Sequence, residues 1–239
     1  MKALILNSGV GCRMSDLTED SPKCLVDLVS GESILSRQLR QLQSAGVSEI
    51  IMTTGYMAEN VENTCAPFAG DMRFSFVENP DYRVTNYIYS IYLARERLSG
   101  EILMLHGDLV LDDRIINDIT AKPHSCMTVS HTRPLPEKDF KAVIKDGKII
   151  SVGVHNFDNS IYAQPLYRLR QSDWEIWLAG IERFCEKGNT GCYAEDALNE
   201  LTDEIKLYPY DIGMRLCMEV DTPDDLNAVN AELSPTQNL

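Results

Sequence analysis

Short apolar runs alternate with helical hydrophobic patterns up to about residue 120. Residues 3–6 have the length of a buried strand, and apolar side chains recur at helical spacing from 34 to 45, where Gly46 supplies a stop. The alternation continues with expected strands at 50–53, 74–77 and 102–105, separated by expected helices at 56–61 and 88–98. This order is typical of an α/β fold with a doubly wound, mostly parallel, Rossmann-like sheet covered by helices on both faces.

The pattern changes after Cys126. Apolar residues on both sides of Asp146-Gly147 predict a tight hairpin, because this pair suits a two-residue turn. Thr222 as N-cap and Pro223 at the first helical position predict the start of a terminal helix. Further strands are expected at 127–132, 161–169, 205–210 and 218–220, with helices at 174–185 and 194–201. This second part is therefore α+β, and we expect it to form a single domain over 1–239 with the first part.

Charge and composition narrow the possible partners. The chain has 22 Lys and Arg against 36 Asp and Glu, a net charge of -14 that argues against a general affinity for nucleic acid or for an anionic membrane. We find no secretory signal and no apolar run long enough to span a bilayer, so we expect a cytoplasmic location. The sequence makes no prediction of oligomeric state. A polyphosphate ligand would need local cations or a bound metal.

The loop after the first apolar run is the candidate binding element. Residues 4–14 read L-I-L-N-S-G-V-G-C-R-M. The glycines match a dinucleotide fingerprint poorly, because Met14 takes the third glycine position and the second strand ends in Thr53-Thr54 instead of a carboxylate. They also fail the P-loop pattern, since no lysine directly follows the second glycine.

A third kind of phosphate loop remains. In this interpretation the backbone amides beside Gly9 and Gly11 cradle triphosphate oxygens. Arg13 and Lys23 then neutralise the charge that develops as pyrophosphate leaves. We therefore predict that the loop holds a nucleoside triphosphate.

Motifs along nearly the whole chain resemble the nucleotidyltransferases that activate sugar phosphates or phosphocholine. The loop, together with S-P-K-C-L at 21–25, is similar to that family's A-A-G-x-G-[ST]-R…P-K signature. Further matches follow in the same order: T-T-G-Y at 53–56, E-N-P-D-Y…T-N-Y-I-Y-S at 78–90, H-G-D at 106–108, A-E-D-A-L-N-E-L at 194–201 and E-V-D-T-P-D-D-L at 219–226. The resemblance is strongest to the small bacterial cytidylyltransferases that make CDP-choline-like products.

The resemblance implies a reaction and a set of roles. CMP would pass from CTP to a small phosphorylated or phosphonate head group, such as phosphocholine or 2-aminoethylphosphonate, with release of pyrophosphate. Asp108 and Asp221 would hold Mg²⁺, while Arg13 and Lys23 would act as the catalytic cations. Residues 1–125 would form the nucleotide-binding half and residues 126–239 the acceptor-binding half.

The binding residues follow from the same motifs. The nucleotide would contact Asn7, Ser8, Gly9, Gly11, Gly55, Tyr56, Asn79, Thr85 and Ser90. The acceptor would contact Asn86, Tyr193, Glu195 and Asp196. A subset of the aromatic residues would enclose a cationic head group, taken from Tyr87, Tyr89, Tyr92, Phe140, Tyr162, Trp174, Trp177 and Tyr193.

Two departures from the family bear on the acceptor. Tyr193 is followed by Ala194, where choline-type members carry tryptophan, and the smaller side chain predicts room for a primary ammonium or a polar substituent. His155 and Asn156 stand near the position where many sugar-activating members place a lysine. This difference argues against a sugar phosphate as the acceptor.

Structural roles are the alternative explanation for several of these residues. Asp108 is also suited to capping a following helix, and Asp221 lies one residue before an N-cap, where a carboxylate favours the helix dipole. Asn79, Asn86 and Ser90 are typical turn and cap residues. Two other functions therefore stay open: a sugar-1-phosphate nucleotidyltransferase and a catalytically lapsed nucleotide-binding or regulatory domain.

Overall fold

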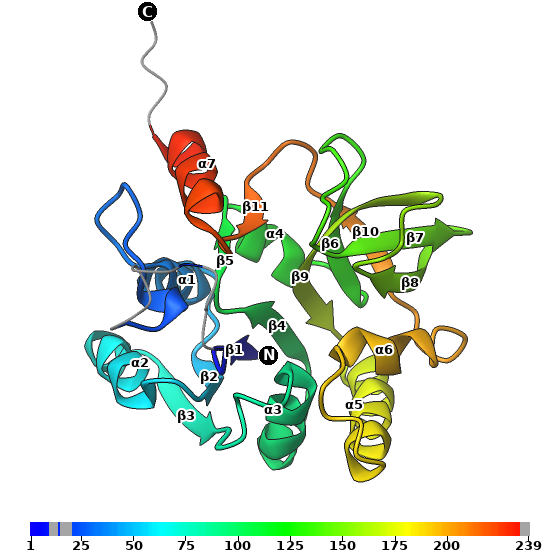
Figure 1. Ribbon diagram of the computed structural model, residues 1–239, viewed down its shortest axis with the longest axis horizontal. Helices are drawn as coiled ribbons and strands as arrows, with labels where there is room; N and C mark the ends of the chain where they lie inside the picture. Colours follow the sequence, from blue (N-terminus) through cyan, green and yellow to red (C-terminus); the bar gives the residue numbers. More distant parts are fainter. Residues whose placement is uncertain (10–13, 15–20, 235–239) are drawn as a thin grey trace, which may run out of the picture.

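The computed structural model describes residues 1–9, 14 and 21–234, and a nine-stranded mixed sheet forms its centre (Figure 1). Seven of the strands lie in the order β10-β6-β9-β4-β1-β2-β3, and β7 joins β9 and pairs with β8. The bounds are β1 (Lys2–Leu6), β2 (Glu49–Thr54), β3 (Arg73–Glu78), β4 (Ile102–His106), β6 (Cys126–Ser130), β7 (Lys141–Lys145), β8 (Lys148–Gly153), β9 (Ser160–Leu169) and β10 (Tyr208–Asp211).

The first four of these strands are parallel, and their carboxyl ends meet at one edge. Leu6 of β1 is in register with Thr53 of β2 and with His106 of β4. The segments that leave these strands therefore begin side by side, which is where open α/β sheets bind their ligands. Strand β9 runs antiparallel to both β4 and β6 and joins the second half of the chain to the first.

A second, smaller sheet was not predicted. Strands β5 (Leu109–Leu111) and β11 (Cys217–Glu219) pair antiparallel, with Leu109 opposite Glu219. Because β5 begins three residues after β4 ends, the chain folds back at Gly107 and Asp108. This pairing joins the H-G-D and E-V-D motifs, which lie more than a hundred residues apart in the sequence.

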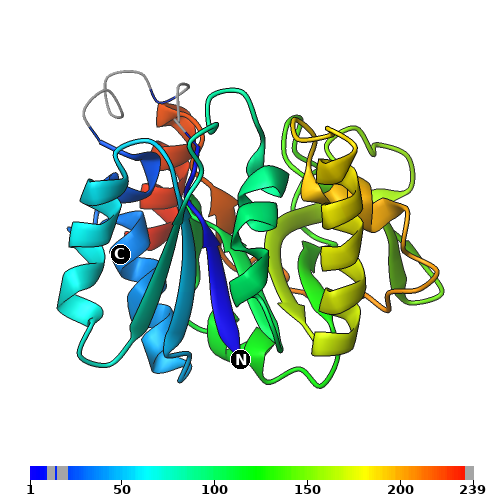
Figure 2. The ribbon, with the colours of Figure 1, turned by 90° about the horizontal axis from the view of Figure 1, so that it is seen from below.

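Helices cover both sides of the parallel strands. The bounds are α1 (Ile34–Ser44), α2 (Ala58–Cys65), α3 (Tyr87–Ala94), α4 (Ile115–Thr120), α5 (Gln171–Glu186), α6 (Ala194–Asn199) and α7 (Pro223–Leu233), with short 3-10 helices η2 (Lys23–Leu25), η3 (Ala66–Phe68) and η4 (Arg95–Arg97). Helices α1 and α2 lie across the strands from α3, which runs beside α5 (Figure 2). None of the helices in the described ranges is long and apolar enough to cross a membrane. The expected cytoplasmic location stays a prediction.

Alternation along β1 builds a core on each face of the sheet. Ala3 and Ile5 pack with buried residues of α1, α2 and α4, whereas Leu4 and Leu6 pack with those of α3, α5 and α6. A third apolar cluster places Val229 of α7 against Ile34 and the β5–β11 pair. These side chains are almost fully buried, each contributing roughly 1.5–3 kcal/mol of hydrophobic stabilisation.

The predicted fold class is confirmed, with local errors. The strand expected at 205–210 starts only at Tyr208, and neither β5 nor α4 was predicted. The terminal helix begins as predicted, because the Thr222 side chain accepts a hydrogen bond from the Asp225 amide and Pro223 follows it. The boundary between nucleotide and acceptor halves at residue 125 stays a prediction.

Candidate active site

A cavity of about 400 Å³ lies at the carboxyl ends of β1 and β4, and it collects most of the predicted site. Its lining includes the predicted residues Asn7, Ser8, Gly9, Lys23, Asn79, Thr85, Asn86, Ser90, Asp108, Tyr193 and Asp221. Gly55, Tyr56, Glu195 and Asp196 are described but do not line it. Gly11 and Arg13 lie outside the described residues.

Lys23 lies between the two predicted metal ligands. It begins η2, and its Nζ donates to Asp108 Oδ2 at 2.5 Å and to Asp221 Oδ1. Asp108 occupies the turn between β4 and β5, while Asp221 follows β11. The Val220 amide donates to the Asp108 carbonyl at 3.0 Å, so the small sheet fixes the two carboxylates side by side. Asp108 does not cap a helix, because strand β5 follows it directly.

Burial and charge act in opposite directions on these groups. Burial alone would lower the pKa of Lys23, but the carboxylates of Asp108 and Asp221 outweigh it and raise that pKa. Burial would raise the pKa of Asp108, yet Lys23 holds it below its usual value. Both groups are therefore charged at neutral pH.

The carboxylates also fit a divalent cation. Asp108 Oδ1 is buried and has no hydrogen-bond partner among the described residues. His106, Asp108 and Glu219 each offer a ligand atom, and these atoms lie within 4.8 Å of one another. Carboxylate oxygens are the ligands that Mg²⁺ prefers, whereas an imidazole is a softer donor. Glu219 was not among the predicted ligands, although it opens the E-V-D motif that contains Asp221.

His106 and Glu219 form a partly buried pair in the lining of the cavity. His106 Nδ1 lies 2.7 Å from Glu219 Oε1. Burial, reinforced by the nearby Asp108, raises the pKa of Glu219 to about 7. Burial would lower the pKa of His106, but its hydrogen bond to Glu219 raises it instead. The hydrogen bond therefore couples the protonation of His106 to that of Glu219.

Helix α1 holds the turn that carries Asp108. The Gln38 side chain is 1% exposed, and its Nε2 donates to the His106 carbonyl at 2.9 Å and to the Leu109 carbonyl at 2.7 Å. Both carbonyls flank Gly107 and Asp108, so Gln38 positions the turn from below. The apolar periodicity of α1 gave no signal for this role, because Gln38 interrupts it with a polar side chain.

Close packing explains the glycine of the H-G-D motif. A Cβ atom at Gly107 would lie 1.4 Å from Asn7 Oδ1, so a larger residue would displace the Asn7 side chain. Asn7 Nδ2 and Ser8 Oγ are buried without a hydrogen-bond partner in the described part of the chain, and both residues line the cavity. These polar atoms suit a ligand that supplies hydrogen-bonding groups.

Other predicted nucleotide-binding residues have structural partners. Asn79 Nδ2 donates at 3.0 Å to both Thr85 Oγ1 and Ser90 Oγ, so Asn79 ties these two residues together. A Cβ atom at Gly55 would lie 2.7 Å from the Ser8 carbonyl oxygen, which shows that the T-T-G-Y segment packs beneath the loop. The role of Tyr56 in nucleotide binding stays a prediction.

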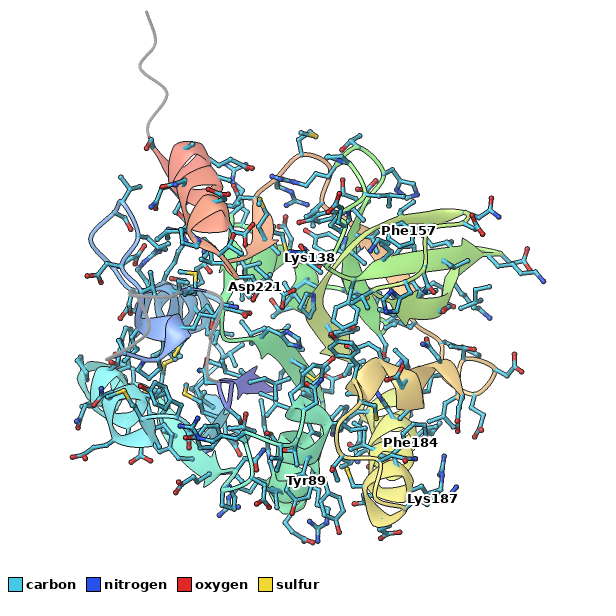
Figure 3. The ribbon with its side chains drawn as sticks, viewed as in Figure 1. Tyr89, Lys138, Phe157, Phe184, Lys187 and Asp221 are labelled. Carbon is cyan, nitrogen blue, oxygen red and sulfur yellow. The ribbon has the colours of Figure 1, made fainter. Side chains whose placement is uncertain are left out.

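Three aromatic rings, those of Tyr87, Phe140 and Tyr193, form part of the cavity lining. The Tyr87 ring centroid lies 4.6 Å from that of His106 and 6.0 Å from that of Tyr193. Tyr193 in turn meets Phe140 edge-on at 5.3 Å. Lys138 and Asp139, which precede Phe140, complete this side of the lining, and Lys138 lies near Asp221 in Figure 3. The motifs contained no indication of Lys138 or Asp139, because both lie in the connection between β6 and β7.

The predicted acceptor residues around α6 have structural partners. Both carboxylate oxygens of Glu195 accept hydrogen bonds, from Tyr87 OH and from Tyr167 OH, so Glu195 supports the Tyr87 ring from behind. Asp196 Oδ2 accepts a bond from the Tyr193 amide at 3.0 Å and caps α6. Asn86 likewise caps α3, where its Oδ1 accepts from the Tyr87 amide.

Ala194 lies in the protein core and not in the lining of the cavity. The residue is fully buried, and its carbonyl accepts a 2.9 Å hydrogen bond from Trp177 Nε1. It is not part of the described lining, so the room expected from the smaller side chain does not arise at Ala194 itself.

Comparisons with known proteins place the chain among nucleotidyltransferases. A family model described as "MobA-like NTP transferase domain" matches residues 3–137. CMP-5'-(3-aminopropyl)phosphonate synthase of Streptomyces rubellomurinus is 32% identical over 56% of this chain, a match that spans only 21% of that protein. Choline-phosphate cytidylyltransferase of Haemophilus influenzae is 23% identical, and the alignment covers 99% of both chains.

A solved structure supports the fold. The CTP:phosphocholine cytidylyltransferase of Streptococcus pneumoniae superimposes with a TM-score of 0.82 at 23% identity, covering 98% of this chain and 99% of that one. At this identity the likeness shows the arrangement of helices and strands.

Proposed function

Because the chain belongs to the family of MobA-like NTP transferase domains, we propose that it is a cytidylyltransferase acting on a small phosphorylated or phosphonate head group. The nucleotidyltransferase class predicted from the motifs is confirmed, while CTP and the acceptor are part of the proposal. An acceptor oxygen would attack the α-phosphorus of CTP. The bond from that phosphorus to the bridging oxygen would break, and pyrophosphate would leave with the electron pair. The product would carry CMP on the acceptor's phosphate or phosphonate.

One observation carries the proposal: Lys23, Asp108 and Asp221 meet in the lining of a cavity to which Asn7, Ser8 and Gly9 also contribute. A cation fixed at that point stabilises negative charge as it develops on a leaving pyrophosphate, and such preorganised charges are the main source of catalysis in transfer to phosphorus. Asp108 and the adjacent Glu219, together with Asp221, which shares the ammonium of Lys23 with Asp108, would hold Mg²⁺. When bound, the ion neutralises phosphate oxygens and polarises phosphorus. Arg13 would add a second cation from the loop.

The cavity favours an acceptor that carries a positive charge. Apart from the proposed metal ligands Asp108, Glu219 and Asp221, the described lining contains the carboxylate of Asp139, which can pair with an ammonium group. The rings of Tyr87, Phe140 and Tyr193 face this region, and a desolvated ammonium over such rings gains up to about 2 kcal/mol. Phosphocholine and 2-aminoethylphosphonate both combine an ammonium with an attacking anionic oxygen.

The two alternative functions have less support. Asn156, which stands near the position of the lysine of sugar-activating members, donates to Ser151 Oγ at 3.0 Å and does not line the cavity. A lapsed domain would have no need for the closely matched charges of Lys23, Asp108 and Asp221.

Pyrophosphate release tests the proposal directly. The purified protein would be incubated with Mg²⁺ and each of CTP, UTP, ATP, GTP and dTTP, together with phosphocholine, 2-aminoethylphosphonate, an amino-acid-derived phosphate or glucose 1-phosphate. We expect release with CTP and an ammonium-bearing acceptor. Asp108→Ala should reduce turnover by about a thousand-fold, a loss of roughly 4 kcal/mol of transition-state stabilisation.

Asp203→Asn serves as the matched control, because this exposed carboxylate lies in a turn remote from the cavity lining. Turnover with glucose 1-phosphate alone would establish the sugar-phosphate alternative. No release with any pair of substrates would support the lapsed domain. Full turnover of Asp108→Ala would refute the proposed metal ligand.

A further inference from the structure

Lys141, the first residue of β7, is a charged residue with no exposed surface. Lysine is almost never fully buried unless its ammonium is paired. Here the partners are neutral: Nζ donates to the carbonyl oxygens of Asp139 at 2.9 Å, Val154 at 2.7 Å and Glu137 at 3.4 Å. Three carbonyl groups from two separate segments thus converge on one ammonium.

The sheet makes room for this side chain. Lys141 lies opposite Gly153 of β8, which has no side chain, and opposite Tyr162 of β9. The Phe157 ring, labelled in Figure 3, lies over the ammonium with its centroid 4.3 Å from Nζ. Burial lowers the pKa of Lys141, and the nearby Asp139 carboxylate opposes that effect. The site therefore holds the side chain through carbonyl dipoles and one ring.

Both segments that Lys141 joins contribute to the cavity. Lys138 and Asp139 line it on one side of the ammonium, and Val154 lines it on the other. Phe140 is held separately, because its carbonyl accepts a hydrogen bond from the Ala163 amide of β9 at 3.2 Å. The tie through Lys141 thus acts on residues 137–139 and on the chain leaving β8.

We propose that Lys141 is a positioning residue for acceptor recognition, whose ammonium fixes the Lys138–Asp139 wall of the cavity against the end of β8. The inference rests on the proposed function, because it takes this wall to contact the acceptor. Lys138 would then stand ready for the acceptor's phosphate or phosphonate oxygens, and Asp139 for its ammonium. The nucleotide side of the cavity, built from the segments after β1 and β4, does not depend on this tie.

Lys141→Met tests the role, since methionine keeps the aliphatic stem and removes the ammonium. We expect the acceptor KM to rise about ten-fold or more, while the CTP KM and kcat stay within about two-fold. Lys141→Arg should restore part of the acceptor KM by retaining a donor cation. Lys145→Met, an exposed lysine at the other end of the same strand, is the matched control and should leave both KM values unchanged.

Hydrogen exchange gives a readout that does not need turnover. Amides of residues 137–140 should exchange faster in Lys141→Met than in the wild type, whereas amides of β1 and β4 should keep their protection. A lower melting temperature with equal effects on both KM values would show a merely structural role and overturn the inference. If Lys141→Met fails to fold, Lys141→Gln decides, because it removes the positive charge and keeps a polar side chain: an acceptor KM and an exchange pattern equal to wild type would refute the inference.

The two proposals fail in different ways. A wild-type protein that releases no pyrophosphate refutes the proposed function, and the exchange experiment still reports on the Lys141 tie. An active wild type whose acceptor KM is insensitive to Lys141→Met refutes only the positioning role.

Discussion

Two lysines beside the cavity, Lys23 and Lys141, have different surroundings. Lys23, whose side chain is 12% exposed, is held by the carboxylates of Asp108 and Asp221, which raise its pKa. Lys141, with no exposed surface, is held by three neutral carbonyl groups, and its pKa is lowered by burial. The first lies in the cavity, and the second lies behind its wall.

The difference separates an ammonium group that can contact a ligand from an ammonium group that only fixes the backbone. Carboxylates can exchange a lysine for a metal ion or share it with a phosphate, so the ammonium of Lys23 is available to a ligand. Backbone carbonyls cannot move without moving the chain, so the ammonium of Lys141 fixes backbone. The same residue type therefore serves opposite purposes on the two sides of one cavity.

Removing the ammonium from Lys23 should give the largest effect. Lys23→Met is expected to lower kcat by about a hundred- to a thousand-fold, because one preorganised charge opposite the leaving group is lost. Pyrophosphate release at saturating CTP measures it, with Lys145→Met as the control. If Lys23→Met raised only the acceptor KM, as we expect of Lys141→Met, the two lysines would share one role and the comparison would fail.

A smaller loss is expected when the support of Asp108 is weakened from α1. Gln38→Leu removes the two hydrogen bonds to the carbonyls of His106 and Leu109, which should shift the turn and lower kcat by about ten-fold. Gln43→Leu on the exposed side of the same helix is the matched control. An equal effect of both variants would assign the loss to general destabilisation of α1.

The smallest effect is expected at the ring over Lys141. Phe157→Ala removes a cation–π contact of an exposed ring, worth about 0.5–1 kcal/mol, and should raise the acceptor KM by about two-fold. Urea denaturation measures the loss of stability, and Leu135→Ala, another exposed apolar residue, provides the comparison. If Phe157→Ala raised the acceptor KM as much as Lys141→Met does, the ring would be more important than the three carbonyl groups for fixing the Lys138–Asp139 wall.

Periodicity was enough to predict the parallel core, because buried strands and amphipathic helices each leave a pattern of their own length. It failed for β5, since a three-residue apolar run carries no period that separates strand from loop. The pairing of β5 with β11 joins Asp108 to Asp221 and Glu219, so that miss also hid one candidate metal ligand.

Motif resemblance predicted which residues collect at the cavity, but not how each one is used. Glu195 lies in a matching motif, yet both of its oxygens bind tyrosine hydroxyls behind the lining. Asp196 and Asn86 cap helices. A motif records that a residue type belongs at a position, and only its neighbours in space show whether it faces a ligand or the scaffold.

The sequence by itself determined the order of the parallel strands β1 to β4 and of the helices between them, the start of the terminal helix and the family, since these depend on local patterns and on motifs at fixed spacing. The tertiary structure decided which charges meet. Lys23 and Asp221 are 198 positions apart, and Lys141 donates to the carbonyl of Val154, directly after the strand that pairs with its own. Electrostatic interactions depend on distance and burial in space, which strand pairing sets and local sequence does not encode.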